Sequence, residues 1–303
     1  MTQPAEPVAA LDPALVLKAS EIAREAGAKL RDFYAHGVET EYKGDVDLVT
    51  VADRTCEKFI RTRLGETFPA HGIYGEEGTR DRLEGEYRWY IDPLDGTTNF
   101  AHGFPHFCVS MGLEHRPPST PPESDGTLAA AIIFDPLRNE LFSAERGSGA
   151  FLNGKRIHVS RAADLAECLI ATGFPSRKRH ESPNIHFYQE FTLRSHGVRR
   201  AGSAALDLAY VAAGRLDGFW EFNLNPWDTA AGILLIEEAG GRITDFSGNR
   251  FRLDSREILA SNGLVQGELL GLFANMFAGV DLDPIPSPRE YAQRRAHRGK
   301  GNS

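Results

Sequence analysis

The sequence predicts an α/β protein in two parts: an N-terminal half with helices and an antiparallel sheet, then a second α/β half. Two observations predict this. Short apolar segments separated by Pro, Gly and Asn-Gly follow one another between residues 89 and 144, as successive strands do. After Ala163, strand-like and helix-like segments alternate. We expect the halves to span residues 11–160 and 161–283.

The first half opens with two predicted helices. Apolar residues at helical spacing predict a helix over residues 13–36, with Gly37 as its stop. A second helix begins after Thr50 and runs through Leu64, ending near Gly65 and Pro69. Its start places Asp53 in the first turn.

The predicted strands of the first half cover residues 89–91, 108–113, 128–134 and 140–144. Residues 116–127 are rich in proline and predict a surface loop between two of them. In the second half we expect strands at 169–172, 197–200 and 218–221, and helices at 206–213 and 229–239.

Composition excludes several classes of protein. The 303 residues include 41% hydrophobic and 25% charged residues, which is typical of a folded chain. A net charge of -8 repels polyanions, so no nucleic-acid partner is expected. No apolar run is long enough to span a bilayer, and no signal peptide is recognised. Three separated cysteines favour a reducing cytoplasm, and the basic segment 284–303 predicts a disordered tail.

The most informative segment is Trp89 to Phe100, in which an apolar strand runs into Asp92-Pro93-Leu94-Asp95-Gly96-Thr97-Thr98. The proline bends the chain so that Asp92 and Asp95 face one point, and the Leu94 carbonyl adds a third oxygen. Hard cations prefer such oxygen clusters. The N–H groups of Gly96 and Thr97 can hold a phosphate if a short helix starts there. An ordinary turn at Asp95-Gly96, with Asp92 as a cap, explains the same residues.

Further acids occur in unusual settings. Glu76 lies between glycines after an apolar pair, and Asp228 follows Trp227 at the start of an apolar helix. Asp228 also fits the role of an N-cap residue, and the two roles are compatible.

Five segments together resemble the motifs of the inositol monophosphatase family, in the family's order. They are Asp47 to Asp53, Gly75-Glu76-Glu77, Asp92 to Asn99, Gly202-Ser203-Ala204-Ala205 and Pro226-Trp227-Asp228. The resemblance covers residues 13–280 and implies a layered α/β sandwich. It also implies a magnesium-dependent phosphomonoesterase.

The resemblance implies a role for each acid. Glu76, Asp92 and the Leu94 carbonyl would hold one Mg²⁺, Asp92, Asp95 and Asp228 a second, and a third would bind weakly near Glu76. Thr97 paired with Asp53 would take a proton from the attacking water, which Glu76 helps to position. Gly96, Thr97 and Thr98 would bind the phosphate.

The resemblance places the substrate's hydroxyls near Ser203, Ala204 and Glu221, with an exposed strand end as the less favoured alternative for Glu221. Lys43 would lie over the site as a charge partner, with an exposed loop lysine as the alternative. The expected substrate is inositol 1-phosphate or a related polyol phosphate.

Other activities remain open from the sequence. Histidinol phosphate is the first alternative substrate within the superfamily, and sugar and nucleotide phosphates are further alternatives. A regulatory binding protein that keeps the fold is the alternative outside enzymes, and the intact acid set argues against it. The resemblance also implies a homodimer and inhibition by lithium.

Overall fold

The computed structural model describes residues 11–36, 40–42, 48–120, 125–174, 182–280, 287 and 289–290. Of residues 40–42 and 48–50 only the backbone is described. Gly37, Lys43 and nearly all of the predicted tail, 284–303, lie outside the described residues.

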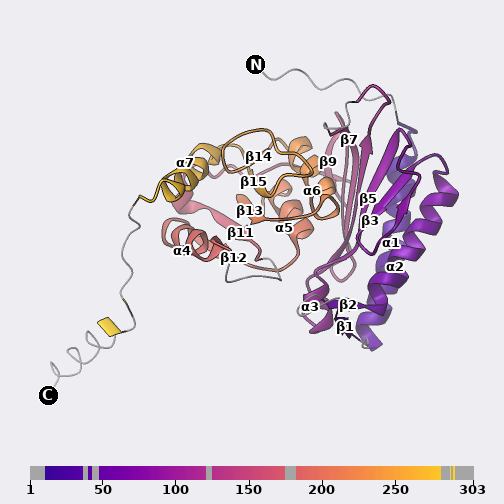
Figure 1. Cartoon of the computed structure of the whole chain (residues 1–303), viewed down its shortest axis with the longest axis horizontal. Coiled ribbons are helices and arrows are strands. Elements are labelled where there is room, and N and C mark those ends of the chain that lie inside the picture. Colours follow the sequence, from indigo (N-terminus) through magenta and orange to yellow (C-terminus); the bar gives the residue numbers. More distant parts are fainter. Residues whose placement is uncertain are drawn as a thin grey trace.

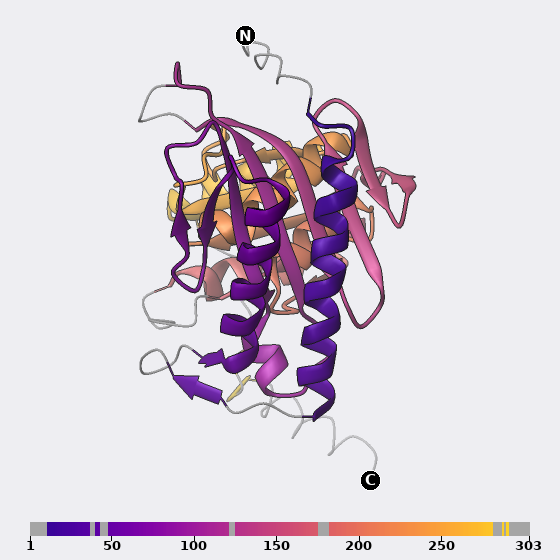
Figure 2. The same cartoon turned by 90° about the vertical axis from the view of Figure 1, so that its right-hand side faces the viewer.

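The described chain forms five layers of alternating helices and sheets (Figure 1). Helices α1 (Leu15–His36) and α2 (Val51–Thr67) cover one face of an eight-stranded sheet, as Figure 2 shows. Helices α5 (Ala204–Ala212) and α6 (Pro226–Glu238) lie between this sheet and a five-stranded one. Helices α4 (Asn184–Arg194) and α7 (Gln266–Phe277) cover the far face. The predicted layered α/β fold is thereby confirmed.

The large sheet has the strand order β10-β9-β8-β7-β6-β5-β3-β4 and is antiparallel except for the parallel pair β3–β5. Its strands are β3 (Gly72–Gly75), β4 (Arg80–Asp81), β5 (Tyr87–Asp95), β6 (Cys108–His115), β7 (Thr127–Asp135), β8 (Glu140–Glu145), β9 (Gly149–Leu152) and β10 (Lys155–Ile157). A separate hairpin joins β1 (Thr40–Tyr42) to β2 (Leu48–Thr50).

The smaller sheet has the order β12-β11-β13-β15-β14. Its strands are β11 (Leu169–Thr172), β12 (Gly197–Arg199), β13 (Gly218–Phe222), β14 (Arg242–Thr244) and β15 (Glu257–Ser261). Strand β11 pairs in parallel with β12 and β13, while β15 pairs antiparallel with β13 and β14. The short 3₁₀ helix η1 (Leu165–Glu167) leads into this sheet.

Helix α6 packs directly on the large sheet although it belongs to the second half of the chain. Gly112 of β6 makes this approach possible, because a Cβ there would lie 2.7 Å from the Cβ of Ala230. On the other side of α6, a Cβ on Gly232 would lie 2.5 Å from the Cβ of Leu208 in α5. The core between the sheets therefore contains residues from both halves, including Ile133 and Leu234.

The predicted helices and strands are all present, with boundaries shifted by a few residues. Helix α5 starts earlier than expected because Ser203 caps it, and α6 starts at Pro226. The sequence interpretation missed α4, α7 and the strands β1, β2, β3, β4, β9, β10, β14 and β15. Most of these strands are only two to four residues long, so their alternation is too brief to detect.

Candidate active site

Asp92 and Asp95 lie at the end of β5, where the register with β6 shifts between them. Pro93 interrupts the ladder there and turns the chain. Asp92 is buried, and its Oδ1 accepts a hydrogen bond from the Leu94 amide at 2.9 Å. Oδ2 of Asp95 accepts one from the Ser203 hydroxyl at 2.6 Å and one from the Ala205 amide at 2.7 Å. These bonds hold each carboxylate in one orientation.

Glu76 lies in the turn between β3 and β4, beside β5. Its amide donates to the Ile91 carbonyl at 3.1 Å. Buried Glu57 of α2 holds this turn: its carboxylate accepts hydrogen bonds from the amides of Glu77 at 2.6 Å and Thr79 at 2.9 Å. Glycine at position 75 leaves room for this carboxylate, because a Cβ there would lie 2.5 Å from Glu57 Oε2. Glu57 thus fixes the backbone that carries Glu76.

Asp228 lies in the first turn of α6. Its Oδ2 accepts from the Asn225 amide at 2.7 Å in a capping box, so its role in capping the helix is real. The side chain is half-buried and extends the acid cluster from the second half of the chain. Asp228 therefore caps the helix and lies in the acid cluster at the same time, and these are the two compatible roles that the sequence indicated.

The acids raise one another's pKa. Burial raises the pKa of Asp92 well above its usual value, and the charges of Glu76, Asp95 and Asp228 raise it further. Burial also raises the pKa of Asp95, while the hydrogen bonds from Ser203 and the backbone lower it. Burial is also the main cause of the raised pKa of Asp228. Within the described residues, no lysine or arginine forms an ion pair with any of these three aspartates.

This donor set fits a hard divalent cation. Carboxylates and a backbone carbonyl are the oxygen ligands that Mg²⁺ prefers, and a cation would offset the repulsion that the pKa shifts express. As they stand, however, no three His, Cys, Asp or Glu side chains in the described part of the chain are arranged to hold a metal ion. The chemistry of the acids nevertheless supports a metal site.

Thr97 and Asp53 meet beside this cluster. The Thr97 hydroxyl is 3.1 Å from Asp53 Oδ1 and 3.1 Å from the Leu94 carbonyl. Thr97 starts the short helix α3 (Thr97–Ala101), and Gly96 before it has a φ of 96° that favours glycine. Asp53 is buried in the first turn of α2. Two segments 44 residues apart thus form the hydroxyl–carboxylate pair expected from the sequence.

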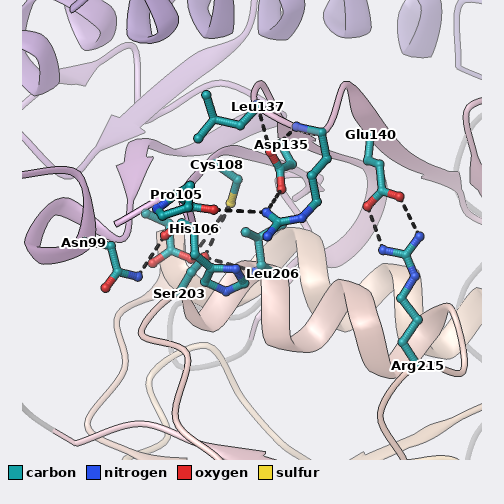
Figure 3. A network of polar contacts seen from close by, with 12 residues as sticks. Asn99, Pro105, His106, Cys108, Asp135, Leu137, Glu140, Ser203, Leu206 and Arg215 are labelled. Carbon is teal, nitrogen blue, oxygen red and sulfur yellow. Dashed lines mark hydrogen bonds and ion pairs between the residues drawn. The ribbon is translucent and has the colours of Figure 1, made fainter. Parts of the chain in front are cut away.

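Asn99 joins the two halves, and Figure 3 shows its side chain beside His106. Its side-chain amide donates to the His106 and Ala201 carbonyls at 2.8 Å each, and its distance to the Gly202 carbonyl is 3.3 Å. The turn at Gly202 is therefore held against the Asp92–Asn99 segment. Another contact between the halves lies further out, where Arg215 and Glu140 form a bidentate ion pair at 2.6 Å (Figure 3).

Of the predicted substrate contacts, Ser203, Ala204 and Glu221 lie on the second half, and Lys43 lies outside the described residues. Ser203 is buried, and its hydroxyl is engaged by Asp95 and by capping α5. Glu221 is also buried, which excludes the reading of an exposed strand end. Its carboxylate lies so close to Gly173 that a Cβ there would be 2.2 Å from both oxygens. Burial and the charge of Asp207 raise the pKa of Glu221.

Sequence reasoning missed Glu57, Asn99 and Asp207. Glu57 lies four residues after Asp53 on α2, so helical spacing already placed it on the same face. Asn99 stands within the quoted motif, but two of its three carbonyl partners, Ala201 and Gly202, lie 102 and 103 residues away in the sequence. Asp207 is 2% exposed, and its Oδ2 has no hydrogen-bond partner among the described residues. Because the residues around Asp207 in the sequence are apolar, nothing in that segment indicated a charged site.

The layers and the buried acids at their junction define a layered α/β protein with a carboxylate site shared by two halves. Residues 12–278 match the model of the inositol monophosphatase family. The chain belongs to the inositol monophosphatase family.

Named relatives carry two kinds of description. The Nus factor SuhB of Pseudomonas aeruginosa is 45% identical over 231 residues, covering 74% of this chain and 82% of the relative. The inositol-1-monophosphatase of Rhizobium meliloti is 44% identical over 246 residues, covering 78% and 88%. Among solved structures, the extragenic suppressor protein suhB of Bartonella henselae superposes with a TM-score of 0.79 at 41% identity, covering 86% of this chain and 98% of that one. In the described residues, no helix is both long and apolar enough to span a membrane.

Proposed function

We propose that the chain is a magnesium-dependent phosphomonoesterase that hydrolyses inositol 1-phosphate or a related polyol phosphate. The observation that carries this proposal is the cluster of Asp92, Asp95, Asp228 and Glu76, in which burial and then the charges of the other three acids raise the pKa of Asp92. Such a cluster is costly unless a cation binds it. Membership of the family and the relatives called inositol-1-monophosphatase support the substrate class.

Two to three Mg²⁺ ions per site are proposed. Glu76, Asp92 and the Leu94 carbonyl would hold one ion, and Asp92, Asp95 and Asp228 another, with a weaker ion near Glu76. When bound, the metal offsets the charge of the phosphate and lowers the pKa of a bound water. The hydrogen bonds from Leu94, Ser203 and Asn225 would hold the acids in place for this task, as outer-shell partners do in metal sites.

The remaining groups would handle protons and the phosphate. The Thr97 hydroxyl, whose partner is Asp53, would accept the water's proton and pass one of its own to the carboxylate. Glu76 would orient that water for in-line attack. The N–H groups of Gly96, Thr97 and Thr98 would bind the phosphate oxygens at the start of α3. No covalent enzyme intermediate is needed.

The leaving alcohol would lie against the second half of the chain. Glu221 would accept hydrogen bonds from its hydroxyls, and Ser203 and Ala204 would line the same side. Lys43 remains a proposed charge partner that lies outside the described residues.

Histidinol phosphate is the second candidate, and one observation favours it. Glu221 is accompanied by the buried acid Asp207, and burial together with the charge of Asp207 raises the pKa of Glu221. A cationic leaving alcohol would offset two neighbouring carboxylates better than a neutral polyol.

A regulatory role is the candidate outside enzymes. It is favoured by the description of relatives as Nus factors. We propose it as an addition to catalysis, since the acid set is complete. A homodimer, a cytoplasmic location and inhibition by lithium complete the proposal.

Phosphate release from a panel of substrates tests these candidates. The panel contains inositol 1-phosphate, histidinol phosphate, fructose 1,6-bisphosphate and adenosine 3′,5′-bisphosphate, each with and without Mg²⁺. We expect Mg²⁺-dependent release from inositol 1-phosphate that Asp95→Asn abolishes. Preference for histidinol phosphate selects the second candidate. A folded, Mg²⁺-saturated protein that cleaves none of the four contradicts the proposed activity.

A further inference from the structure

Arg80 on the edge strand β4 lies against two aromatic rings beside the acid cluster. Its guanidinium carbon is 3.6 Å from the centre of the Tyr74 ring and 5.6 Å from that of Trp227. The two rings are themselves 5.6 Å apart at 35°. A guanidinium stacks well on aromatic faces through cation–π attraction. The three side chains form one stack, which we call the Arg80 stack.

One end of the Arg80 stack holds the turn that carries Glu76. Arg80 is the cross-strand partner of Tyr74, and its guanidinium donates to the carbonyls of Gly75 and, at 2.8 Å, Thr79. The Gly75 amide closes the turn by donating to the Thr79 carbonyl at 2.9 Å. Arg80 therefore binds the backbone immediately before Glu76.

The other end of the stack holds the residue before Asp228. The indole Nε1 of Trp227 is buried and has no hydrogen-bond partner among the described residues. Ring packing is therefore what orients this side chain. The Trp227 carbonyl accepts from Ser110 of β6 at 3.4 Å, which ties only its backbone to the sheet.

We propose that Arg80 is a positioning residue that fixes Glu76 relative to Asp228 and thereby sets the affinity of the acid cluster for a divalent cation. This inference rests on the proposed function for the nature of the site. The Arg80 stack is the direct side-chain link between the turn from the first half and the helix end from the second half. If Arg80 acts through geometry, its removal weakens cation binding. If it acts only through its charge, its removal strengthens cation binding, since a nearby positive charge alone weakens it.

The test measures Mn²⁺ binding without substrate, through loss of the paramagnetic resonance signal of the free ion. Arg80→Gln removes the charge, and Arg80→Lys keeps the charge but loses the planar group. We expect both variants to bind Mn²⁺ about 5- to 10-fold more weakly, at the low end for outer-shell residues of metal sites. Arg24→Gln is the matched control, because Arg24 also lies over a ring, 5.1 Å from that of Phe134, and donates to Asn139.

The outcomes separate the inference from the proposed function. Unchanged or tighter binding by Arg80→Gln overturns the inference, even if the variant melts at a lower temperature. Weaker binding by Arg80→Gln with normal binding by Arg80→Lys shows that the planar guanidinium is not needed and also overturns the inference. If wild type binds Mn²⁺ and the variants lose affinity, but no substrate is cleaved, the inference stands and the proposed function fails. Absence of Mn²⁺ binding by wild type overturns both.

Discussion

The Thr97 hydroxyl donates to Oδ1 of Asp53 at 3.1 Å and joins the helix after β5 to the first turn of α2. If this pair deprotonates water, Thr97→Val should lower kcat by about 10²- to 10⁴-fold, the contribution usual for general base catalysis. Thr97→Ser should keep most of the rate because it keeps the hydroxyl. Thr62→Val on the exposed side of α2 is the control. Phosphate release measures all three, and a Thr97→Val enzyme with normal kcat would remove the pair from the mechanism.

Asn99→Ala should weaken the contact between the halves. Three carbonyl groups lose their shared donor, so we expect the free energy of unfolding to fall by about 2 kcal/mol. KM should rise more than kcat falls, since the Gly202 turn approaches the leaving alcohol and not the water. Denaturant unfolding and steady-state kinetics measure the two effects. Asn275→Ala on the exposed face of α7 should change neither, and equal effects of the two substitutions would contradict the assignment.

Gly112→Ala should separate α6 from the large sheet. The added methyl would lie 2.7 Å from the Ala230 Cβ and 2.8 Å from the Ala231 amide nitrogen, a contact that must be relieved by moving the helix. Overpacking of this kind costs about 1–3 kcal/mol. Gly271→Ala in α7 has no atom within 4 Å and should instead stabilise the protein by about 0.5–1 kcal/mol. Thermal unfolding of both variants measures these changes in stability. Destabilisation by Gly271→Ala would show that the space around a glycine does not by itself determine the effect of adding a methyl group.

His71 should make the protein sensitive to mild acid. Burial lowers the pKa of His71 to about 4, and its Nδ1 accepts a hydrogen bond from the Trp89 indole at 3.1 Å. The unfolded chain takes up this proton at about pH 6.5, before the folded one. Stability from His71 is therefore complete above pH 6.5 and lost as the pH falls toward 4.

The expected loss over that range is about 1.5 kcal/mol, half the full value for such a shift, since His71 is half-buried. His71→Gln keeps an acceptor for Trp89 without titrating. Its free energy of unfolding should fall less steeply than that of wild type between pH 6.5 and 4. Parallel curves for the two proteins would rule out this role for His71.

Asp92→Asn should stabilise the protein when chelator removes divalent ions. The carboxylate lies among Glu76, Asp95 and Asp228, and the amide can keep the bond from the Leu94 amide. We expect a gain of about 1 kcal/mol from relieved repulsion. Saturating Mg²⁺ should stabilise wild type by about 2–3 kcal/mol and the variant far less. A variant less stable than wild type in chelator would show that repulsion is not the dominant effect at this position.

Local patterns allowed the long elements and the acid-bearing segment to be predicted. Helix α1 has apolar residues at steady spacing, and β5 runs without a break into Asp92. The site was harder because its parts meet only in the folded chain. Glu57 supports Glu76 across 19 residues, Asn99 reaches Ala201, and Arg80 lies on Trp227. None of these pairings leaves a periodic pattern in the sequence, so the sequence indicated candidate acids of the site but not the residues that hold them in place.

Helix α6 affects how the chain can be divided. It comes from the second half, yet it covers the face of β6 at Gly112 and places Asp228 beside the strand that ends at Asp95. A fragment ending at residue 160 would expose to water the sheet face that includes Ile133 and Phe142, which α5 and α6 cover in the whole chain. Such a face promotes aggregation. Recombination between genes that transferred only the first half would therefore leave out helix α6, which begins more than sixty residues after residue 160.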